Sequence, residues 1–218
     1  MSEGSDAVIF DLDGTLIDTE RLYVDCAVAA LAHLGHGVAR DFVLTLVGHS
    51  DSEGNRRLAR HIGPAFDERA FTQRWSLEID TRAGTAIDPM PGAAELLGHL
   101  AARATPRAIA TNSATATAHR KLSRAGLTGF FQAPHVFGHD RAVRPKPAPD
   151  LFLAAAAALA TEPARCLVFE DSHTGVEAAL AAGMRVVHVA GLLPDPHPDA
   201  HIRAETLIAG ARAARLFD

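Results

Sequence analysis

The chain has 218 residues, 48% of them hydrophobic and 22% charged, which indicates one large or two small folded domains and excludes a mostly disordered protein. The formal net charge of −5 provides no overall positive field for nucleic acid. The longest apolar run, residues 151–160, is too short to span a bilayer, and the acidic N-terminus does not resemble a basic signal peptide.

The first predicted element is a strand over residues 7–10, where four consecutive apolar residues suit a strand that is buried on both faces. The stretch that follows contains helical patterns and no strand pattern. Its predicted helices cover residues 20–34, 50–63 and 67–83, and residues 85–92 form a return linker. We therefore expect a core of residues 1–17 and 89–218, interrupted by an all-helical insertion over residues 18–88.

Strand and helix patterns alternate through the rest of the chain. Predicted strands cover residues 107–111, 135–137, 166–169 and 185–189, and predicted helices cover residues 91–102, 113–126, 149–160 and 174–182. Such alternation is typical of an α/β protein with a doubly wound parallel sheet. The stretch after Pro194, rich in Pro, Asp and His, is predicted to be a surface loop that leads to a last short helix.

Two carboxylates follow the first predicted strand, in the sequence AVIFDLDGTLIDTE. Alternation along an extended chain puts Asp11 and Asp13 on the same side, at the end of the sheet where ligands of parallel-sheet proteins bind. Carboxylates this close repel each other unless a proton or a cation lies between them. The alternative interpretation is a surface turn with helix-capping aspartates.

A second acidic pair, Glu170 and Asp171, follows the predicted strand 166–169 and precedes a turn and a helix. Two strand ends with two acids each offer the oxygen ligands that a hard divalent cation prefers. The alternative is that Asp171 or Ser172 only caps the next helix.

The strand over residues 107–111 ends in groups that suit an anion. Thr111, Asn112 and Ser113 precede a predicted helix, and hydroxyls and backbone amides at such a helix N-terminus can bind phosphate. Simple capping of that helix by Ser113 explains the same residues.

Lysine is rare in this chain. Only two of the 21 basic residues are lysines, Lys121 and Lys146, so a lysine at a candidate site is informative. Lys146 lies in the segment RPKPAPD, between two prolines that stiffen the backbone and place the lysine more firmly. A solvated loop lysine is the alternative.

Taken in order, Asp11–x–Asp13–Gly14–Thr15, Thr111, Lys146 and Glu170–Asp171 resemble the four sequence motifs of the haloacid dehalogenase superfamily. The helical insertion resembles the cap domain of that superfamily. The segments KPAPD and EDSxxGxxAAxAAGM are most similar to the β-phosphoglucomutase-like phosphatase branch. The resemblance covers nearly the whole chain and implies a Rossmann-like core with an inserted helical cap.

The resemblance implies a phosphatase that hydrolyses a small phosphate monoester, a sugar or polyol phosphate, through an aspartyl-phosphate intermediate. Asp11 would be the nucleophile, and Asp13 would be first the general acid and then the general base. Thr111 and the amide of Asn112 would bind the phosphoryl group. Lys146 would neutralise negative charge on Asp11 and on that group.

The same resemblance implies Mg²⁺ as the cofactor. Its ligands would be Asp11, the carbonyl oxygen of Asp13, Asp171 and Glu170. Elementary electrostatics agrees, because a phosphate dianion cannot approach ionised carboxylates unless a divalent cation and a lysine offset the repulsion.

Three other functions are compatible with the sequence. A phosphosugar mutase of the same branch is the nearest, but the mutases carry a histidine where Tyr23 stands, and an arginine soon after a glycine where His49 follows Gly48. A dehalogenase is disfavoured because it has no leaving alcohol for Asp13 to protonate. A non-catalytic module that binds a phosphorylated ligand is the alternative of another class, although no motif acid is missing.

The predicted insertion is expected to set substrate specificity. Gly48 and His49 lie in a loop between two of its predicted helices and are candidates for contact with the substrate, although His49 can equally be an ordinary loop residue. Phe71 and Trp75 are assigned to packing. A metal site at His197 and His201 is disfavoured, because Pro198 opposes a regular helix there.

The expected partner is a small phosphorylated metabolite, with no nucleic acid and no membrane, and the expected state is a monomer or a weak homodimer. Cys26 and Cys166 are too few for a disulfide framework and lie in apolar runs. We interpret them as reduced core residues of a cytoplasmic protein.

Overall fold

The structure is a computed structural model that describes residues 5–46, 51–83, 86–191 and 196–217. The chain divides into two compact units. The core unit comprises Met1–Asp18 and Asp88–Asp218, and the helical unit comprises Thr19–Ile87. The boundaries expected from the sequence lie one residue away from these positions.

The sheet of the core unit has six parallel strands, among the described residues, in the order β3-β2-β1-β4-β5-β6. They are β1 (Ala7–Phe10), β2 (Arg107–Ala110), β3 (Val136–Phe137), β4 (Cys166–Glu170), β5 (Arg185–Val189) and β6 (Ile202–Ala204). The central strand β1 pairs with β2 and β4, so Ile9 stands opposite Ala108 and Val168. The predicted doubly wound parallel α/β architecture is confirmed.

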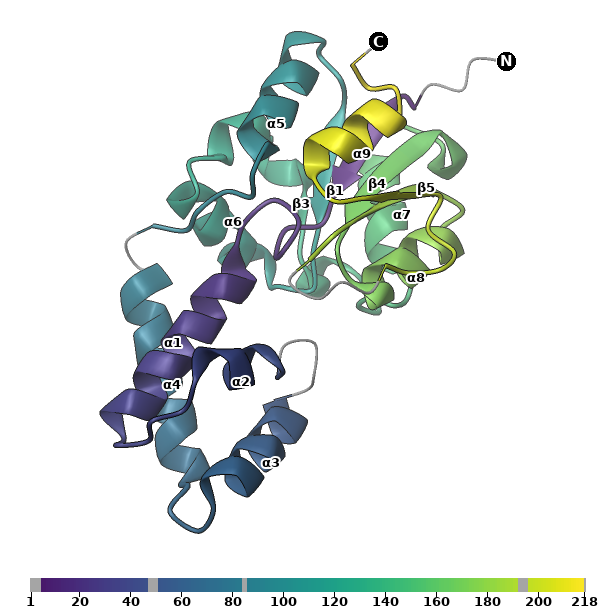
Figure 1. The fold of residues 1–218 in the computed structure, drawn as a ribbon. Coiled ribbons are helices and arrows are strands. Elements are labelled where there is room, and N and C mark those ends of the chain that lie inside the picture. The colour runs from purple at the N-terminus through teal and green to yellow at the C-terminus, as the bar shows by residue number, and fades with distance from the viewer. Residues whose placement is uncertain (1–4, 47–50, 84–85, 192–195, 218) are drawn as a thin grey trace. The chain divides into compact units, whose positions relative to one another are not determined.

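Helices cover both faces of this sheet (Figure 1). They are α5 (Ala93–Ala102), α6 (Thr115–Arg124), α7 (Asp150–Ala158), α8 (His173–Ala181) and α9 (Leu207–Ala213), with 3₁₀ turns at Thr128–Phe130, Ala133–His135, His139–Arg141 and Pro163–Arg165. Side chains alternate along a strand, so Val186 packs with the helices α7 and α8, whereas its neighbour Val187 faces Gly210 of α9.

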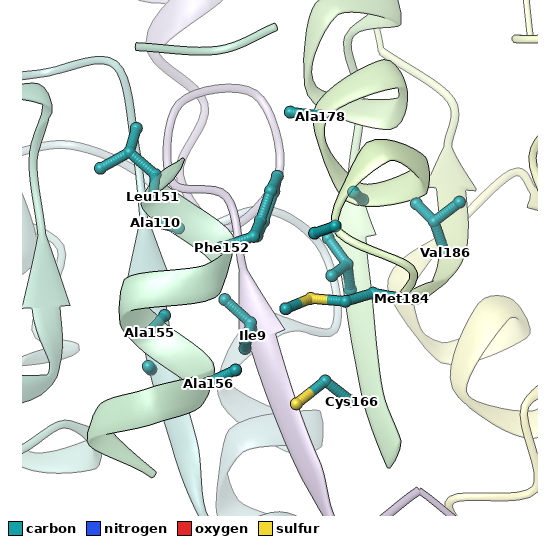
Figure 2. Packing of buried hydrophobic residues seen from close by; sticks show 14 of the residues in the cluster. Ile9, Ala110, Leu151, Phe152, Ala155, Ala156, Cys166, Ala178, Met184 and Val186 are labelled. Atoms are coloured by element: carbon teal, nitrogen blue, oxygen red, sulfur yellow. The ribbon is translucent and has the colours of Figure 1, made fainter. Parts of the chain in front are cut away.

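The core under α7 and α8 combines many alanines with larger apolar side chains such as Leu151 and Phe152 (Figure 2). Phe152 of α7 packs in one cluster with Ile9 of β1 and with Met184, the residue before β5. All three side chains are buried. All four residues of β1 are buried, because a central parallel strand has helices on both faces. This rigid strand fixes the position of the acidic residues that follow it.

The helical unit contains α1 (Thr19–His33), α2 (Arg40–Leu44), α3 (Asp51–Ile62) and α4 (Glu68–Ala83). Its own buried cluster includes Leu31, Leu58 and Phe71. Phe71 stacks on Trp75 with ring centroids 5.8 Å apart, and the Trp75 indole N–H donates to the Tyr23 carbonyl at 3.0 Å. The assignment of Phe71 and Trp75 to packing is therefore confirmed.

Two elements differ from the sequence prediction. The stretch predicted as a surface loop after Pro194 includes the edge strand β6, which pairs with β5. Ile202–Ala204 is only partly buried, and the exposed Arg203 interrupts its apolar residues, so it lacks the continuous apolar run by which the other strands were predicted. The five-residue helix α2 also lacks a prediction, because a helix this short shows no full apolar period.

None of the helices in the described ranges is long and apolar enough to cross a membrane. Cys26 and Cys166 are both free and buried, as the sequence predicted.

Candidate active site

Three neighbouring strands carry polar residues at their carboxyl ends. Asp11 follows β1, Thr111 follows β2, and Glu170 is the last residue of β4. Because these strands are adjacent in the order β2-β1-β4, their ends meet at one edge of the sheet. The structure thus brings together the motif residues that the sequence spreads over more than half of the chain.

Lys146 is the centre of this group. Its ammonium nitrogen Nζ lies 2.6 Å from Asp11 Oδ1 and 2.6 Å from Glu170 Oε1. Lys146 and Asp11 are each 6% exposed, and Glu170 is 1% exposed. The interpretation of Lys146 as a solvated loop residue is therefore wrong, since the ammonium is buried between two carboxylates.

The backbone of Lys146 is held by Asn112. The Asn112 side-chain carbonyl accepts the Lys146 N–H at 3.0 Å, and its amide donates to the Lys146 carbonyl at 3.3 Å. A backbone held at both polar groups, in a segment between two prolines, fixes where the long side chain starts. The Asn112 side chain thus helps to place Lys146, and its predicted role in binding the phosphoryl group stays a prediction.

Glu170 has donors on both carboxylate oxygens. Its Oε1 accepts from Lys146, and its Oε2 accepts from the backbone N–H of Asp171 at 2.9 Å and from the backbone N–H and hydroxyl of Ser172 at 2.8 and 2.9 Å. The Ser172 side chain also caps α8 by accepting the Gly175 N–H at 3.1 Å. Capping by Ser172 and a buried functional acid thus coexist in one turn.

Glycine at position 175 makes room for the Glu170 carboxylate. A Cβ added there would lie 1.7 Å from Glu170 Oε1, far inside van der Waals contact. We expect Gly175→Ala to push Glu170 away from Lys146 and to destabilise the protein by about 1–3 kcal/mol in urea unfolding, with loss of activity.

A matched control is Gly98→Ala in α5, where a Cβ meets nothing within 4 Å. Because alanine is the better helix former, this variant should gain about 0.5–1 kcal/mol. Equal behaviour of the two variants would contradict the packing argument.

The Asp171 carboxylate lies beside Gly14 and Thr15, in the turn that follows β1. Gly14 has φ +85°, and a Cβ there would lie 2.1 Å from Asp171 Oδ2, so only glycine fits both the backbone conformation and the space. The Thr15 hydroxyl donates to Asp171 Oδ1 at 2.9 Å. This contact connects the first motif to the last and keeps the Asp171 carboxylate beside the turn that follows β1.

Asp13 accepts hydrogen bonds from two residues that follow β2. Its Oδ1 accepts from Lys121 Nζ at 2.5 Å, and its Oδ2 accepts from the Ser113 hydroxyl at 2.9 Å. The prediction that Ser113 caps α6 is wrong, because the cap position is Ala114, which forms no side-chain capping bond. Lys121 was absent from the predicted site, although the rarity of lysine in this chain was the signal that could have found it.

Burial and neighbouring charges shift the pKa values of Asp11 and Lys146. Burial raises the pKa of Asp11 to about 7; the neighbouring Lys146 opposes this rise, and the nearby Glu170 and Asp13 carboxylates add to it. Burial alone would lower the pKa of Lys146, but the adjacent Asp11 and Glu170 carboxylates raise it above its ordinary value. Lys146 therefore stays charged at neutral pH.

The donor set fits a hard divalent cation. In their ionised forms Asp11, Asp13, Glu170 and Asp171 bring four carboxylates against the two ammonium groups of Lys121 and Lys146. The excess of negative charge in a largely buried place favours an added cation with oxygen ligands. Within the described ranges, no three His, Cys, Asp or Glu side chains are already gathered as metal ligands.

Some predicted residues contribute differently or lie elsewhere. Thr111 is buried, and its hydroxyl oxygen accepts the Ser113 N–H at 3.1 Å, so it shapes the turn after β2. Gly48 and His49 lie outside the described residues. His197 is buried and its ring lies 5.0 Å from that of His173, and His201 accepts the backbone N–H of Val186 at 3.3 Å.

Comparison with known proteins agrees with this arrangement. The family model of the haloacid dehalogenase-like hydrolases matches residues 8–189. This match spans most of the chain and includes every motif residue of the site. The chain therefore belongs to the haloacid dehalogenase-like hydrolases.

Two curated relatives of this chain are named as phosphatases. The "Probable pseudouridine-5'-phosphatase" of Drosophila melanogaster is 36% identical over 194 residues, which cover 86% of this chain and 81% of that protein. Hexitol phosphatase A of Escherichia coli is 35% identical over 187 residues, 83% of this chain and 81% of that protein. A HAD family hydrolase of Deinococcus radiodurans, solved with bound phosphate and sodium, has a TM-score of 0.79 at 32% identity and covers 99% of this chain and 97% of its own.

Proposed function

We propose that this protein is a Mg²⁺-dependent phosphatase that hydrolyses a small phosphate monoester, a sugar or polyol phosphate, through an aspartyl-phosphate intermediate. The observation that carries the proposal is the buried Lys146 ammonium between Asp11 and Glu170, with Asp13 on the same turn. The family membership and the relatives named as phosphatases support it.

In the first step, a carboxylate oxygen of Asp11 attacks phosphorus and the bond from phosphorus to the leaving oxygen breaks. The leaving oxygen takes a proton from Asp13 and departs as an alcohol, which leaves the Asp13 carboxylate ionised. The Lys146 ammonium, 2.6 Å from Asp11 Oδ1, offsets the negative charge that gathers as phosphate meets carboxylate.

In the second step, water attacks the phosphorus of the aspartyl phosphate and gives a proton to Asp13. The bond from phosphorus to the Asp11 oxygen breaks, so inorganic phosphate leaves and both aspartates return to their starting forms. One residue thus acts as acid and then as base, which requires its carboxylate to keep the same position through both steps.

Mg²⁺ would be held by Asp11, Asp171 and the carbonyl oxygen of Asp13, with Glu170 beside them. When bound, it supplies a Lewis acid that offsets the charge of the phosphoryl oxygens. Thr111 and the Asn112 amide would bind a phosphoryl oxygen. Glu170 would help to keep Lys146 in place. Its Oε2 accepts the Asp171 N–H, which holds the carboxylate, and its Oε1 accepts from the Lys146 ammonium.

The helical unit would act as the cap that selects the substrate, with Gly48 and His49 as proposed contacts to the leaving group. The relatives are named for the phosphates of pseudouridine and of hexitols. Both names describe a hydroxylated leaving group of sugar or polyol character, so we propose that class for this chain.

The test is phosphate release from a panel of sugar, polyol, nucleoside and glycerol monophosphates, with Mg²⁺ or with a chelator. We expect release from at least one member, dependent on Mg²⁺ and reduced by roughly 10²-fold or more when the metal is removed. The variant Asp11→Asn is the blank.

The outcomes separate the alternatives. Phosphate release without Mg²⁺, or by the Asp11→Asn blank, would contradict the mechanism. An isomerised product that forms only after a sugar bisphosphate is added would instead show a mutase. Binding of the esters with no turnover would show a phospho-ligand module.

A further inference from the structure

Lys121, the other of the two lysines in the chain, also lies at the site. It belongs to α6, where Ala118 and Leu122 are buried, and its own side chain is only 12% exposed. Its ammonium donates to Asp13 Oδ1 at 2.5 Å and to the Ser113 hydroxyl oxygen at 3.0 Å. Ser113 in turn donates to Asp13 Oδ2 at 2.9 Å, so the three groups close a ring of hydrogen bonds.

Lys121 and Ser113 differ in the hydrogen bonds that they can form with Asp13. An ammonium group has three donors and no acceptor, so Oδ1 beside Lys121 can only accept. A hydroxyl both donates and accepts, so Ser113 can face Oδ2 whether or not that oxygen carries a proton. These two contacts therefore treat the two oxygens of the Asp13 carboxylate unequally.

We propose that Lys121 is a positioning residue that confines the catalytic proton of Asp13 to Oδ2. This inference rests on the proposed phosphatase function and concerns how its acid is held. Lys121 fixes the carboxylate through Oδ1 and leaves Oδ2 as the oxygen that gives its proton to the leaving group and later receives one from water. Without Lys121 the carboxylate can rotate, and the proton can reside on either oxygen.

The role predicts a dependence on the leaving group. An alkyl phosphate needs a proton on its leaving oxygen, whereas p-nitrophenyl phosphate releases a stabilised phenolate that needs none. A defect in the placement of the acid therefore slows transfer from the alkyl ester and spares transfer from the nitrophenyl ester. A general loss of structure slows both alike.

The experiment compares Lys121→Met with wild type in the presence of Mg²⁺. Rapid-quench measurement of the first turnover gives the rate of leaving-group release from the best alkyl phosphate of the panel and from p-nitrophenyl phosphate. We expect Lys121→Met to slow release from the alkyl ester about 10- to 100-fold, a part of the full contribution of a general acid, and release from the nitrophenyl ester less than about 3-fold.

Two further variants make the comparison sharp. Arg120→Met removes a positive charge from the neighbouring, exposed position of α6 and should change neither rate. Lys121→Arg keeps a donor-only cation and should recover most of the rate with the alkyl ester. Equal losses on both esters in Lys121→Met, or no loss at all, would overturn the positioning role. A wild type that releases neither leaving group would overturn the proposed function itself.

Discussion

Asp11→Asn is expected to abolish phosphate release and, at the same time, to make the metal-free protein more stable at pH 8. The first effect follows because the amide is not a nucleophile, so turnover should fall by roughly 10⁴-fold or more. The second follows because Asp11 is a buried carboxylate, and burial raises its pKa from 3.8 to about 7. The asparagine has nearly the same shape and carries no charge.

The sign of the pH dependence follows from this pKa. The folded state binds the Asp11 proton more tightly than the unfolded state does, so the group costs nothing below pH 4 and destabilises the fold increasingly as the pH rises through 7. The difference in the free energy of unfolding between Asp11→Asn and wild type should therefore open between pH 4 and pH 7. At pH 8 we expect a gain of about 1–4 kcal/mol for the variant.

Urea unfolding at pH 5 and pH 8 with a chelator measures this difference. Added Mg²⁺ should stabilise the wild type more than the variant, because a ligand that binds the folded state stabilises it. Asp6→Asn is a matched control: Asp6 is exposed, and its hydrogen bond with Arg165 lowers its pKa, so its loss should give no gain at pH 8. An Asp11→Asn variant that is less stable than wild type at pH 8 would refute the argument.

The strands of the core could be predicted because central parallel strands are buried on both faces and must be apolar throughout. β1 and β5 have the predicted bounds, and β2, β3 and β4 differ by one residue at an end. The edge strand β6 could not be predicted in this way, since it is only partly buried and Arg203 interrupts its apolar residues, whereas both residues of the other edge strand, β3, are buried.

The acids of the site could be predicted because they follow predicted strands directly, and strand ends of a parallel sheet lie at one edge. The residues that hold these acids and Lys146 in place could not be predicted. Lys121 reaches Asp13 across 108 positions of sequence, and Asn112 reaches Lys146 across 34, so no local pattern relates them. Ser113 shows the same limit, because a residue type that favours helix caps here serves the Asp13 carboxylate.

The ion pairs of the two lysines differ in burial. A substitution at Lys121 therefore serves as a control for the same substitution at Lys146. Lys146 is 2% exposed at its side chain and contacts two carboxylates that are 9% and 1% exposed. Lys121 is 12% exposed and contacts Asp13, which is 25% exposed. Removal of a partner is costly only where the remaining charge cannot reach water.

Lys146→Met is therefore expected to destabilise the protein by about 3–5 kcal/mol at pH 8, because Asp11 and Glu170 are left as uncompensated buried charges. Lys121→Met removes the same charge and should cost only about 0–1 kcal/mol. The cost of Lys146→Met should shrink as the pH falls from 8 to 5, since loss of the ammonium raises the pKa of Asp11 further and protonation then removes the repulsion.

The same variant separates stability from catalysis. Assays at pH 7 with saturating Mg²⁺, below the unfolding temperature of each variant, should show phosphate release reduced by roughly 10³-fold for Lys146→Met, because no cation offsets charge on Asp11 and the phosphoryl group. Asp11→Asn combined with Lys146→Met should recover stability, since one of the two uncompensated carboxylates is gone, but not activity. A double variant as unstable as Lys146→Met alone would show that the lysine stabilises the fold by packing, and not through the charges of Asp11 and Glu170.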